Sequence, residues 1–462
     1  MHAGVALVSF AAAWLVAHDR ARSGILLVAA GACAAYVLRR RDNGVYAGTA
    51  LIVLIPYQTT LLLHQTSIPR VAVLIGAAGF VASAAGVERS GVQRGNRATV
   101  ADLAAAAYLL FAFISWFLTP HVRSSLQATI NAMLPLAFYA YGRGLASRST
   151  RSLAWVLTSS GAAVAMTVLF EYFIAHRPLF IDPTTYLWNA KGGLIFRPGG
   201  VFGSPPAAAT VLAMTALIAF GLYSEARGIR RQLLVMMVAL TVGGLFVTFT
   251  RAGLIAFAVG ALAYVALVRP SVLPRAALGA MVATVAFAFV LMPRIANASW
   301  YQEGILRQGD LSARQSYWRQ ALPLITNSST HLFVGHGINS LVIGRPELPG
   351  PPNADLAAAP TLLQIGPHNQ YVRTLFEEGF VGLSILVTWL VAAIGAAVAV
   401  ARNGRLDSGR QQSAACAAAL IAFMVASSAG DSLRNPPTFA VAALIAGMAV
   451  TARQRGRWGD AR

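Results

Sequence analysis

Long apolar runs separated by short polar segments repeat along most of this 462-residue chain. A transmembrane helix needs about 20 mostly apolar residues. The pattern predicts spans near residues 2–17, 23–38, 45–63, 71–87, 101–118, 124–141, 153–175, 205–223, 233–250, 252–268, 275–292, 379–401, 413–430 and 436–452. Because the first two runs are short and the run 124–141 contains polar residues, we expect roughly 12 to 14 spans. The pattern is typical of an all-α polytopic membrane protein.

One polar excursion, Leu291 to Pro367, is the only long interruption of the apolar pattern. It is too long for a simple connector and therefore predicts a folded module outside the membrane. The expected organisation is transmembrane helices with short loops over 1–292, a large loop module over 293–367, and a helix start followed by C-terminal spans over 368–462.

Composition supports the membrane assignment, since hydrophobic residues make up 57% of the chain and charged residues 11%. Soluble domains carry about 25% charged residues. The net charge of +20 suggests nucleic acid at first, but the basic residues lie between spans and form no basic domain with aromatic platforms. The only cysteines, Cys33 and Cys416, lie inside predicted spans, which excludes a disulfide framework and favours buried packing residues.

The distribution of arginine predicts the topology, because cytoplasmic loops are enriched in Lys and Arg. Most of the 36 basic residues fall in one alternating set of segments: 39–44, 88–97, 142–152, 224–231, 269–275, 402–410 and the tail from 453. This set is expected to be cytoplasmic, together with both termini. The segment 175–204, Arg251 and the long excursion are then expected to lie on the external face.

Two of the external segments carry arginines at the edge of the membrane. Arg197 opens a loop rich in Gly and Pro that ends at Pro206, where glycines allow a close approach to a ligand; an ordinary turn is the alternative. Arg251 lies between two long apolar runs with almost no loop. Because an arginine near hydrocarbon is costly, it indicates a functional site, whereas snorkelling or a topology signal is the simpler explanation.

The long excursion holds two further candidates. Arg314 and Trp318 are one helical turn apart, which suits either sugar stacking or a surface helix anchored at the membrane interface. His336 lies in the turn Gly335-His336-Gly337, where an ordinary, satisfied turn histidine is the alternative.

The excursion closes with His368-Asn369-Gln370-Tyr371, which leads back into apolar residues. Pro367 suits the first turn of a helix, and the period from His368 to Phe376 is helical. His368 is therefore expected at a helix N-terminus. The positive partial charge there disfavours imidazolium, so a neutral histidine able to accept a proton is expected, with a capping or interfacial histidine as the alternative.

These motifs together resemble the O-antigen ligase and polymerase superfamily. They occur in this order: the loop Arg197 to Phe202, Thr250-Arg251-Ala252-Gly253, Arg314 with Trp318, Gly335-His336-Gly337, and His368-Asn369-Gln370-Tyr371 through Glu378-Gly379-Phe380-Val381-Gly382. The last is the most specific. Pro206 departs from the family pattern, in which Asn is expected.

The resemblance is closest to O-antigen ligase and implies a C-type glycosyltransferase in the bacterial inner membrane, with its active site on the periplasmic face. It implies an undecaprenyl-pyrophosphate-linked glycan as donor, lipid A-core as acceptor, and inversion without a metal or other cofactor. His368 corresponds to the catalytic base, and Arg197 and Arg251 to pyrophosphate-binding residues. The wider motif adds Arg314, His336, Trp318 and Tyr371 to the substrate-binding set.

The residues themselves agree with such chemistry, because the planar guanidinium binds phosphate oxygens in bidentate fashion. A histidine base removes the proton of the acceptor hydroxyl. Polymerases and protein O-oligosaccharyltransferases of the same superfamily need the same groups and remain open. A transporter of lipid-linked glycans or anions is the alternative from another class. It is disfavoured because no internal repeat is evident and the polar groups gather at one face.

Overall fold

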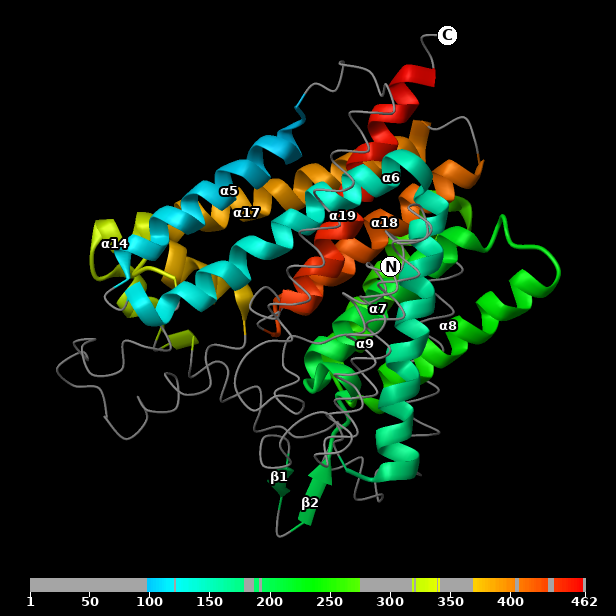
Figure 1. Cartoon of the computed structure of the whole chain (residues 1–462), viewed down its shortest axis with the longest axis horizontal. Coiled ribbons are helices and arrows are strands. Elements are labelled where there is room, and N and C mark those ends of the chain that lie inside the picture. The colour runs from blue at the N-terminus through cyan, green and yellow to red at the C-terminus, as the bar shows by residue number, and fades with distance from the viewer. Residues whose placement is uncertain are drawn as a thin grey trace, which may run out of the picture.

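The computed structural model describes residues 98–119, 122–177, 187–190, 193–274, 318–319, 321–338, 340, 369–403, 407–430 and 436–459. The four predicted spans from 2 to 87 and the span 275–292 lie outside the described residues, as do Arg314 and His368. The described part is a bundle of long helices with one two-stranded hairpin (Figure 1).

The helices follow the predicted spans closely. They are α5 (Val100–Leu118), α6 (Val122–Phe170), α7 (Pro205–Leu222), α8 (Ile229–Val247), α9 (Arg251–Val268), α14 (Ser329–Val334), α17 (Gln370–Asn403), α18 (Asp407–Ser427) and α19 (Pro436–Gly459). Among the described residues, six helices are long and apolar enough to cross a membrane. The mostly helical, multi-pass membrane fold is therefore confirmed.

Helix α6 is two helices that meet at a kink, as the predicted pair of spans requires, but helical residues fill 142–152, where a loop was predicted. The only break is at Ser149, whose backbone is extended (φ −157°, ψ 102°). The Ser149 hydroxyl accepts a hydrogen bond from the Ser152 amide at 3.1 Å and so caps the second half. The polar composition that suggested a loop therefore marks a tight, capped junction between two helices.

Short elements connect α6 to α7 on one side of the bundle. A π-helical turn, η1 (Glu171–Ala175), ends α6, and the strands β1 (Leu187–Ala190) and β2 (Gly193–Phe196) form an antiparallel hairpin. A 3-10 turn, η3 (Gly200–Phe202), then precedes α7. A second 3-10 turn, η4 (Pro270–Val272), follows α9. The loop predicted over 175–204 is thus partly regular structure.

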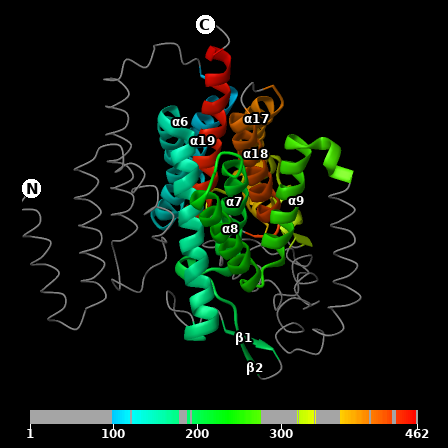
Figure 2. The same cartoon turned by 90° about the vertical axis from the view of Figure 1, so that its right-hand side faces the viewer.

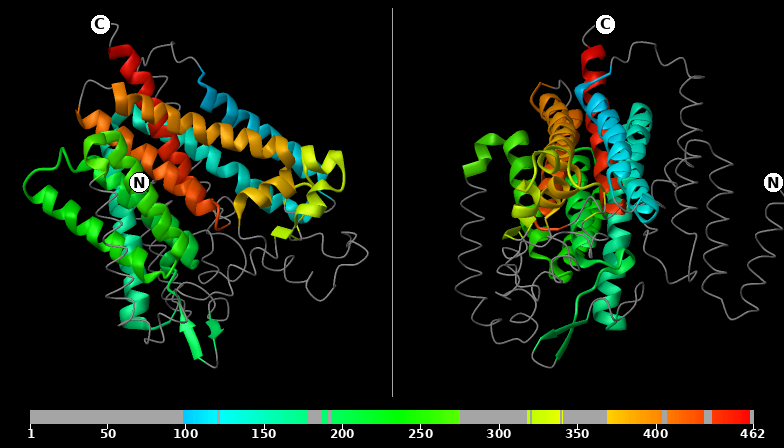
Figure 3. Two further views of the ribbon diagram at one scale, coloured as in Figure 1. Left: turned by 180° about the vertical axis from the view of Figure 1, so that it is seen from behind. Right: turned by 90° about the vertical axis from the view of Figure 1, so that its left-hand side faces the viewer.

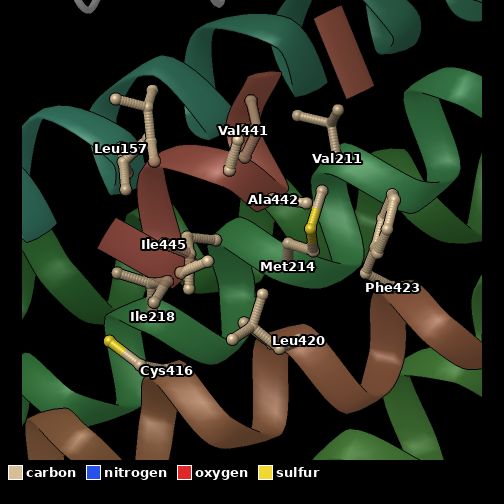
Figure 4. Close-up of a cluster of buried hydrophobic side chains, with 14 of the residues drawn as sticks. Leu157, Val211, Met214, Ile218, Cys416, Leu420, Phe423, Val441, Ala442 and Ile445 are labelled. Atoms are coloured by element: carbon tan, nitrogen blue, oxygen red, sulfur yellow. The ribbon is translucent and has the colours of Figure 1, made fainter. Parts of the chain in front are cut away.

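Helix α7 lies at the centre of the bundle, and nearly all its residues are buried (Figure 2). Val211, Met214 and Ile218 of α7 meet Leu420 and Phe423 of α18 in the core (Figure 4). The sequence allows this because α7 and α18 are rich in alanine, and small residues let membrane helices approach closely. Cys416 lies in the same core as a free, buried thiol, as expected for a packing residue.

The chain alternates between two ends of the bundle. At one end, α5 begins, α19 finishes, and Arg143 of α6 contacts both Asp102 and Gln454. We call this the paired end. At the other end, called the site end, α8 turns into α9 and α17 begins. Helices α5 and α17 run side by side, and α14 packs against α17 (Figures 1 and 3).

Candidate functional site

Arg197 binds the turn between α8 and α9. Its Nη2 atom donates to the Thr250 hydroxyl at 3.0 Å and to the Phe249 carbonyl at 3.2 Å, and its Nε atom donates to the Thr248 carbonyl at 3.4 Å. These carbonyls follow the last turn of α8, where helical partners are lacking. The guanidinium therefore fixes the turn through three neutral oxygen atoms.

Arg251 is the first residue of α9 and is half-buried. The preceding turn is tight, because Phe249 adopts a left-handed backbone conformation (φ 51°) that non-glycine residues rarely occupy. Two residues into α9, a Cβ on Gly253 would lie 2.6 Å from the Ala209 Cβ of α7. The start of α9 is therefore packed directly on the helix that follows the Arg197 loop, so that the chain brings Arg197 and Arg251 to one junction.

The loop after Arg197 is anchored to the end of α6 by a residue that sequence reasoning missed. Glu171, which is 1% exposed, accepts a hydrogen bond from the Gly200 amide through its Oε2 atom at 2.7 Å. The Thr167 hydroxyl accepts from the Val201 amide at 3.2 Å. The sequence did contain a signal, because Glu171 is an acidic residue inside the apolar run 153–175. Ionisable residues inside predicted spans commonly have a functional role.

The helix that follows the His368 motif begins later than expected. Asn369 caps it, because its Oδ1 atom accepts from the amides of Tyr371 at 3.0 Å and Val372 at 3.2 Å. The helix begins at Gln370, so Pro367 does not occupy its first turn. His368 lies outside the described residues and directly precedes the capping residue.

The first part of α17, Gln370 to Glu378, is a separate segment because Gly379 breaks the helix (φ 66°, ψ −171°). Its polar side is the buried side, which the apolar period did not reveal. Three contacts lie on this side: Gln370 Nε2 to the Thr374 hydroxyl at 3.0 Å, Arg373 Nε to Glu377 at 3.0 Å, and the Tyr108 hydroxyl to Glu378 at 3.2 Å. The buried charges of Arg373 and Glu377 persist because they are paired.

The turn Gly335-His336-Gly337 docks on the end of this segment. The amides of His336 and Gly337 donate to the carbonyls of Phe376 and Glu377 at 3.0 and 2.9 Å. The break at Gly379 leaves these carbonyls without their usual helical partners. Gly335 is required here because its φ is 80° and a Cβ would lie 2.4 Å from the Glu377 carbonyl oxygen.

The His336 ring is held between two others. It stacks on Phe376 and on His331, with ring centroids 4.4 and 4.0 Å apart, and its Nδ1 lies 3.2 Å from the Phe376 carbonyl oxygen. Since a carbonyl only accepts, Nδ1 carries the proton of the neutral ring and Nε2 accepts. Burial lowers the pKa of His336 below its ordinary value.

His336 lies away from the start of the 370–378 helix. Phe376 is six residues beyond Gln370, which corresponds to about 9 Å along a helix at 1.5 Å per residue. His336 therefore marks the opposite end of the 370–378 segment from the end that follows His368. The sequence motifs placed His336 and His368 in one candidate site. His336 docks at the far end of the 370–378 helix, whereas His368 precedes its first residues in the chain.

Tyr371 connects the beginning of α17 to α18, because its hydroxyl donates to the Met424 carbonyl at 2.8 Å. Helix α18 runs antiparallel to α9, and a Cβ on Gly260 would lie 2.9 Å from the Ala418 carbonyl oxygen. Arg251 lies nine residues before Gly260, which is about 13 Å along α9. This displacement is toward the C-terminal end of α18. Tyr371 and Arg251 thus lie toward the same end of the α9–α18 pair.

Of the remaining candidates, Trp318 is half-buried in a short helical stretch, and Arg314 lies outside the described residues. Among the predicted site residues that are described, the structure joins Arg197 to the turn that begins α9 with Arg251. Tyr371 lies at the beginning of the 370–378 segment, and His336 docks at its other end. Both arrangements belong to the site end of the bundle.

The apolar helices are long enough to cross a membrane and define a multi-pass membrane protein. The polar junctions described above place its candidate site at the site end of the bundle. Residues 235–387 match the family model described as O-antigen ligase. This match confirms the resemblance found in the sequence to the O-antigen ligase superfamily, whose members are membrane glycosyltransferase-like enzymes. No curated protein matches the chain.

Proposed function

We propose that this protein is an O-antigen ligase of the bacterial inner membrane. In this proposal it transfers a glycan from undecaprenyl pyrophosphate to lipid A-core oligosaccharide on the periplasmic side. The observation that carries the proposal is the family match, since the matched segment 235–387 includes both Arg251 and His368. Arg197 lies outside that segment but is hydrogen-bonded to residues 248–250 within it.

In the proposed reaction, the acceptor hydroxyl oxygen attacks the anomeric carbon of the donor sugar as His368 takes its proton. The new glycosidic bond forms while the bond from the anomeric carbon to the phosphate oxygen breaks. The undecaprenyl pyrophosphate leaves with the electron pair, and attack from the opposite side inverts the anomeric centre. Arg197 and Arg251 stabilise the charge on the leaving pyrophosphate, which is the role that planar guanidinium groups suit best.

The other candidate residues divide according to their contacts. Tyr371 and His336 support the 370–378 helix, since the Tyr371 hydroxyl and the His336 ring are both bonded to backbone carbonyls. In the proposal they position that helix and do not bind sugar. Arg314 and Trp318 remain proposed contacts of the glycan, on the strength of the motif alone.

The test of the base is His368→Ala in purified protein, supplied with lipid-linked glycan and lipid A-core. General-base catalysis typically contributes about 10²–10⁴-fold, so the transfer rate should fall by that order while donor binding persists. His64→Ala, outside the family-matched segment, is the matched control and should transfer at the wild-type rate. Near wild-type transfer by His368→Ala would exclude histidine as the base.

Ligase and polymerase activities are separated by deleting the gene and analysing lipopolysaccharide on a gel. Loss of all O-antigen from the core, with lipid-linked polymer retained, identifies a ligase. A core that bears single repeats identifies a polymerase and contradicts the proposal. Transfer that is unchanged in a chelator supports the metal-free reaction, whereas loss restored by added metal contradicts it.

A further inference from the structure

We propose that Glu171 is a positioning residue for the arginine junction: its carboxylate holds the Gly200 loop on α6 so that Arg197 reaches the turn where α9 begins. This inference rests on the proposed function in so far as the junction binds a pyrophosphate. It adds a residue outside the segment 235–387 that matches the family model.

The first step is the clamp between the loop and α6. Glu171 Oε2 accepts from the Gly200 amide at 2.7 Å, and Thr167 Oγ1 accepts from the Val201 amide at 3.2 Å. Gly200 has φ +53°, and a Cβ there would lie 2.5 Å from Thr167 Oγ1. The loop backbone therefore lies directly on α6, and the carboxylate supplies the acceptor that a buried amide requires.

The second step is the shape of the helix end. Residues Glu171–Ala175 form a π-helical turn, and such turns re-aim side chains and are frequent at functional sites. The next residue in this turn, Tyr172, packs edge-on against Phe249, with ring centroids 5.5 Å apart. The π-turn thus touches both partners of the junction, the Gly200 loop through Glu171 and the α8–α9 turn through Tyr172.

The third step is the direction of the loop. Arg197 lies three residues before Gly200 and donates to three oxygen atoms of residues 248–250. Once the Gly200 amide is fixed, only this short stretch separates the anchor from the guanidinium. Releasing the anchor moves Arg197 relative to the start of α9, and a displacement of about 1 Å can cost 100-fold in an organised site.

The experiment compares Glu171→Ala with Glu171→Gln in protein reconstituted with lipid-linked donor. Alanine removes the acceptor, whereas glutamine keeps an oxygen atom for the Gly200 amide. We expect Glu171→Ala to raise the KM for the donor roughly 10- to 100-fold, with the KM for the acceptor unchanged. Glu171→Gln should raise the KM for the donor less than Glu171→Ala does, because its amide oxygen keeps an acceptor for the Gly200 amide.

Hydrogen exchange gives a readout that does not depend on the reaction. Glu171→Ala should speed exchange at residues 199–203 and 248–251, and Glu171→Gln should not. Thr158→Val is the control, because Thr158 is a buried residue of the same helix, 13 residues or roughly 20 Å from Glu171. Unchanged exchange in Glu171→Ala overturns the inference. Equal donor KM values for Glu171→Ala and wild type overturn it as well.

Two further variants keep the test decisive. If Glu171→Ala does not fold, Thr167→Val removes the second anchor and should shift exchange and donor KM in the same direction, by less. In an Arg197→Ala background, Glu171→Ala should add almost nothing, since both act through one guanidinium. Fully multiplicative effects would show that Glu171 does not act through Arg197.

Failure of the proposed function has a different signature. If wild-type protein transfers no glycan to lipid A-core, binding of undecaprenyl pyrophosphate in nanodiscs replaces the kinetic readout. Weaker binding by Glu171→Ala, restored by Glu171→Gln, then supports the inference without ligase activity. Wild-type protein that does not bind this lipid contradicts the proposed function and the donor-positioning role, while hydrogen exchange still decides whether the clamp exists.

Discussion

The two ends of the bundle use arginine in different ways. At the paired end, Arg143 of α6 contacts the Asp102 carboxylate of α5 and the Gln454 side chain of α19, which joins three helices. At the site end, Arg197 donates to two backbone carbonyls and one hydroxyl. A carboxylate offsets the charge of its partner, whereas carbonyl and hydroxyl oxygen atoms fix the direction of a guanidinium. The first arrangement joins helices, and the second orients Arg197 at the turn where α9 begins.

The largest expected difference in glycan transfer comes from replacing an arginine by lysine at each of the two ends. Arg251→Lys should lower glycan transfer at least about tenfold, because lysine keeps the charge but not the planar fork that binds phosphate. Arg143→Lys should leave transfer within about twofold, because an ammonium still pairs with Asp102. The measurement is the transfer rate per folded protein for each variant. Equal losses at both ends would mean that Arg251 has a structural role like that of Arg143.

A smaller effect, on stability alone, is expected from Asp102→Asn. Asp102 accepts from the Thr99 amide, the Thr99 hydroxyl and the Tyr139 hydroxyl, each at 2.8 Å, besides pairing with Arg143. The amide cannot accept all of these bonds, so the free energy of unfolding should fall by about 2 kcal/mol. Thermal unfolding in detergent measures the loss. Transfer per folded molecule should not change, and a large drop would couple the paired end to the chemistry.

The helices were largely predictable from sequence, whereas the contacts at the two ends of the bundle were not. Apolar length alone located α5, α7, α8 and α9 within a few residues, because the membrane imposes that length. It could not reveal that Glu171 anchors the Gly200 loop, because that contact joins residues 29 apart through a π-turn with no sequence signature.

The same limit applies to the 370–378 helix. Its apolar period predicted a helix, but it did not predict that Glu377 and Thr374 on the polar side are fully buried. Periodicity reports where apolar residues lie and not which side meets protein in a membrane, since the apolar side can face lipid. The turn Gly335-His336-Gly337 was noticed only as a weak motif. Its role depends on close backbone contact with Glu377, which follows from the three-dimensional fold.

The smallest expected effect is on the pH dependence of the free energy of unfolding. It involves His336, whose half-buried ring lies at the site end. Burial lowers the pKa of His336, and the neighbouring His331 ring acts in the same direction. As pH falls below the ordinary value of 6.5, the unfolded chain binds the proton before the folded protein does. The free energy of unfolding should therefore decrease on acidification, and neutral His336 should contribute no such pH dependence above that range.

His336→Asn isolates this effect, since an asparagine amide can still donate to the Phe376 carbonyl but does not titrate. Its unfolding temperature should fall less than that of wild type between pH 7.5 and pH 5.5, when both are measured by the same thermal unfolding assay. His336→Phe keeps the stacking on Phe376 without the hydrogen bond, so it should lose stability at both pH values and show the same reduced slope. If wild type and His336→Asn respond identically to acid, the docked turn is not sensitive to protonation. In that case its stability depends on the backbone hydrogen bonds to Phe376 and Glu377 alone.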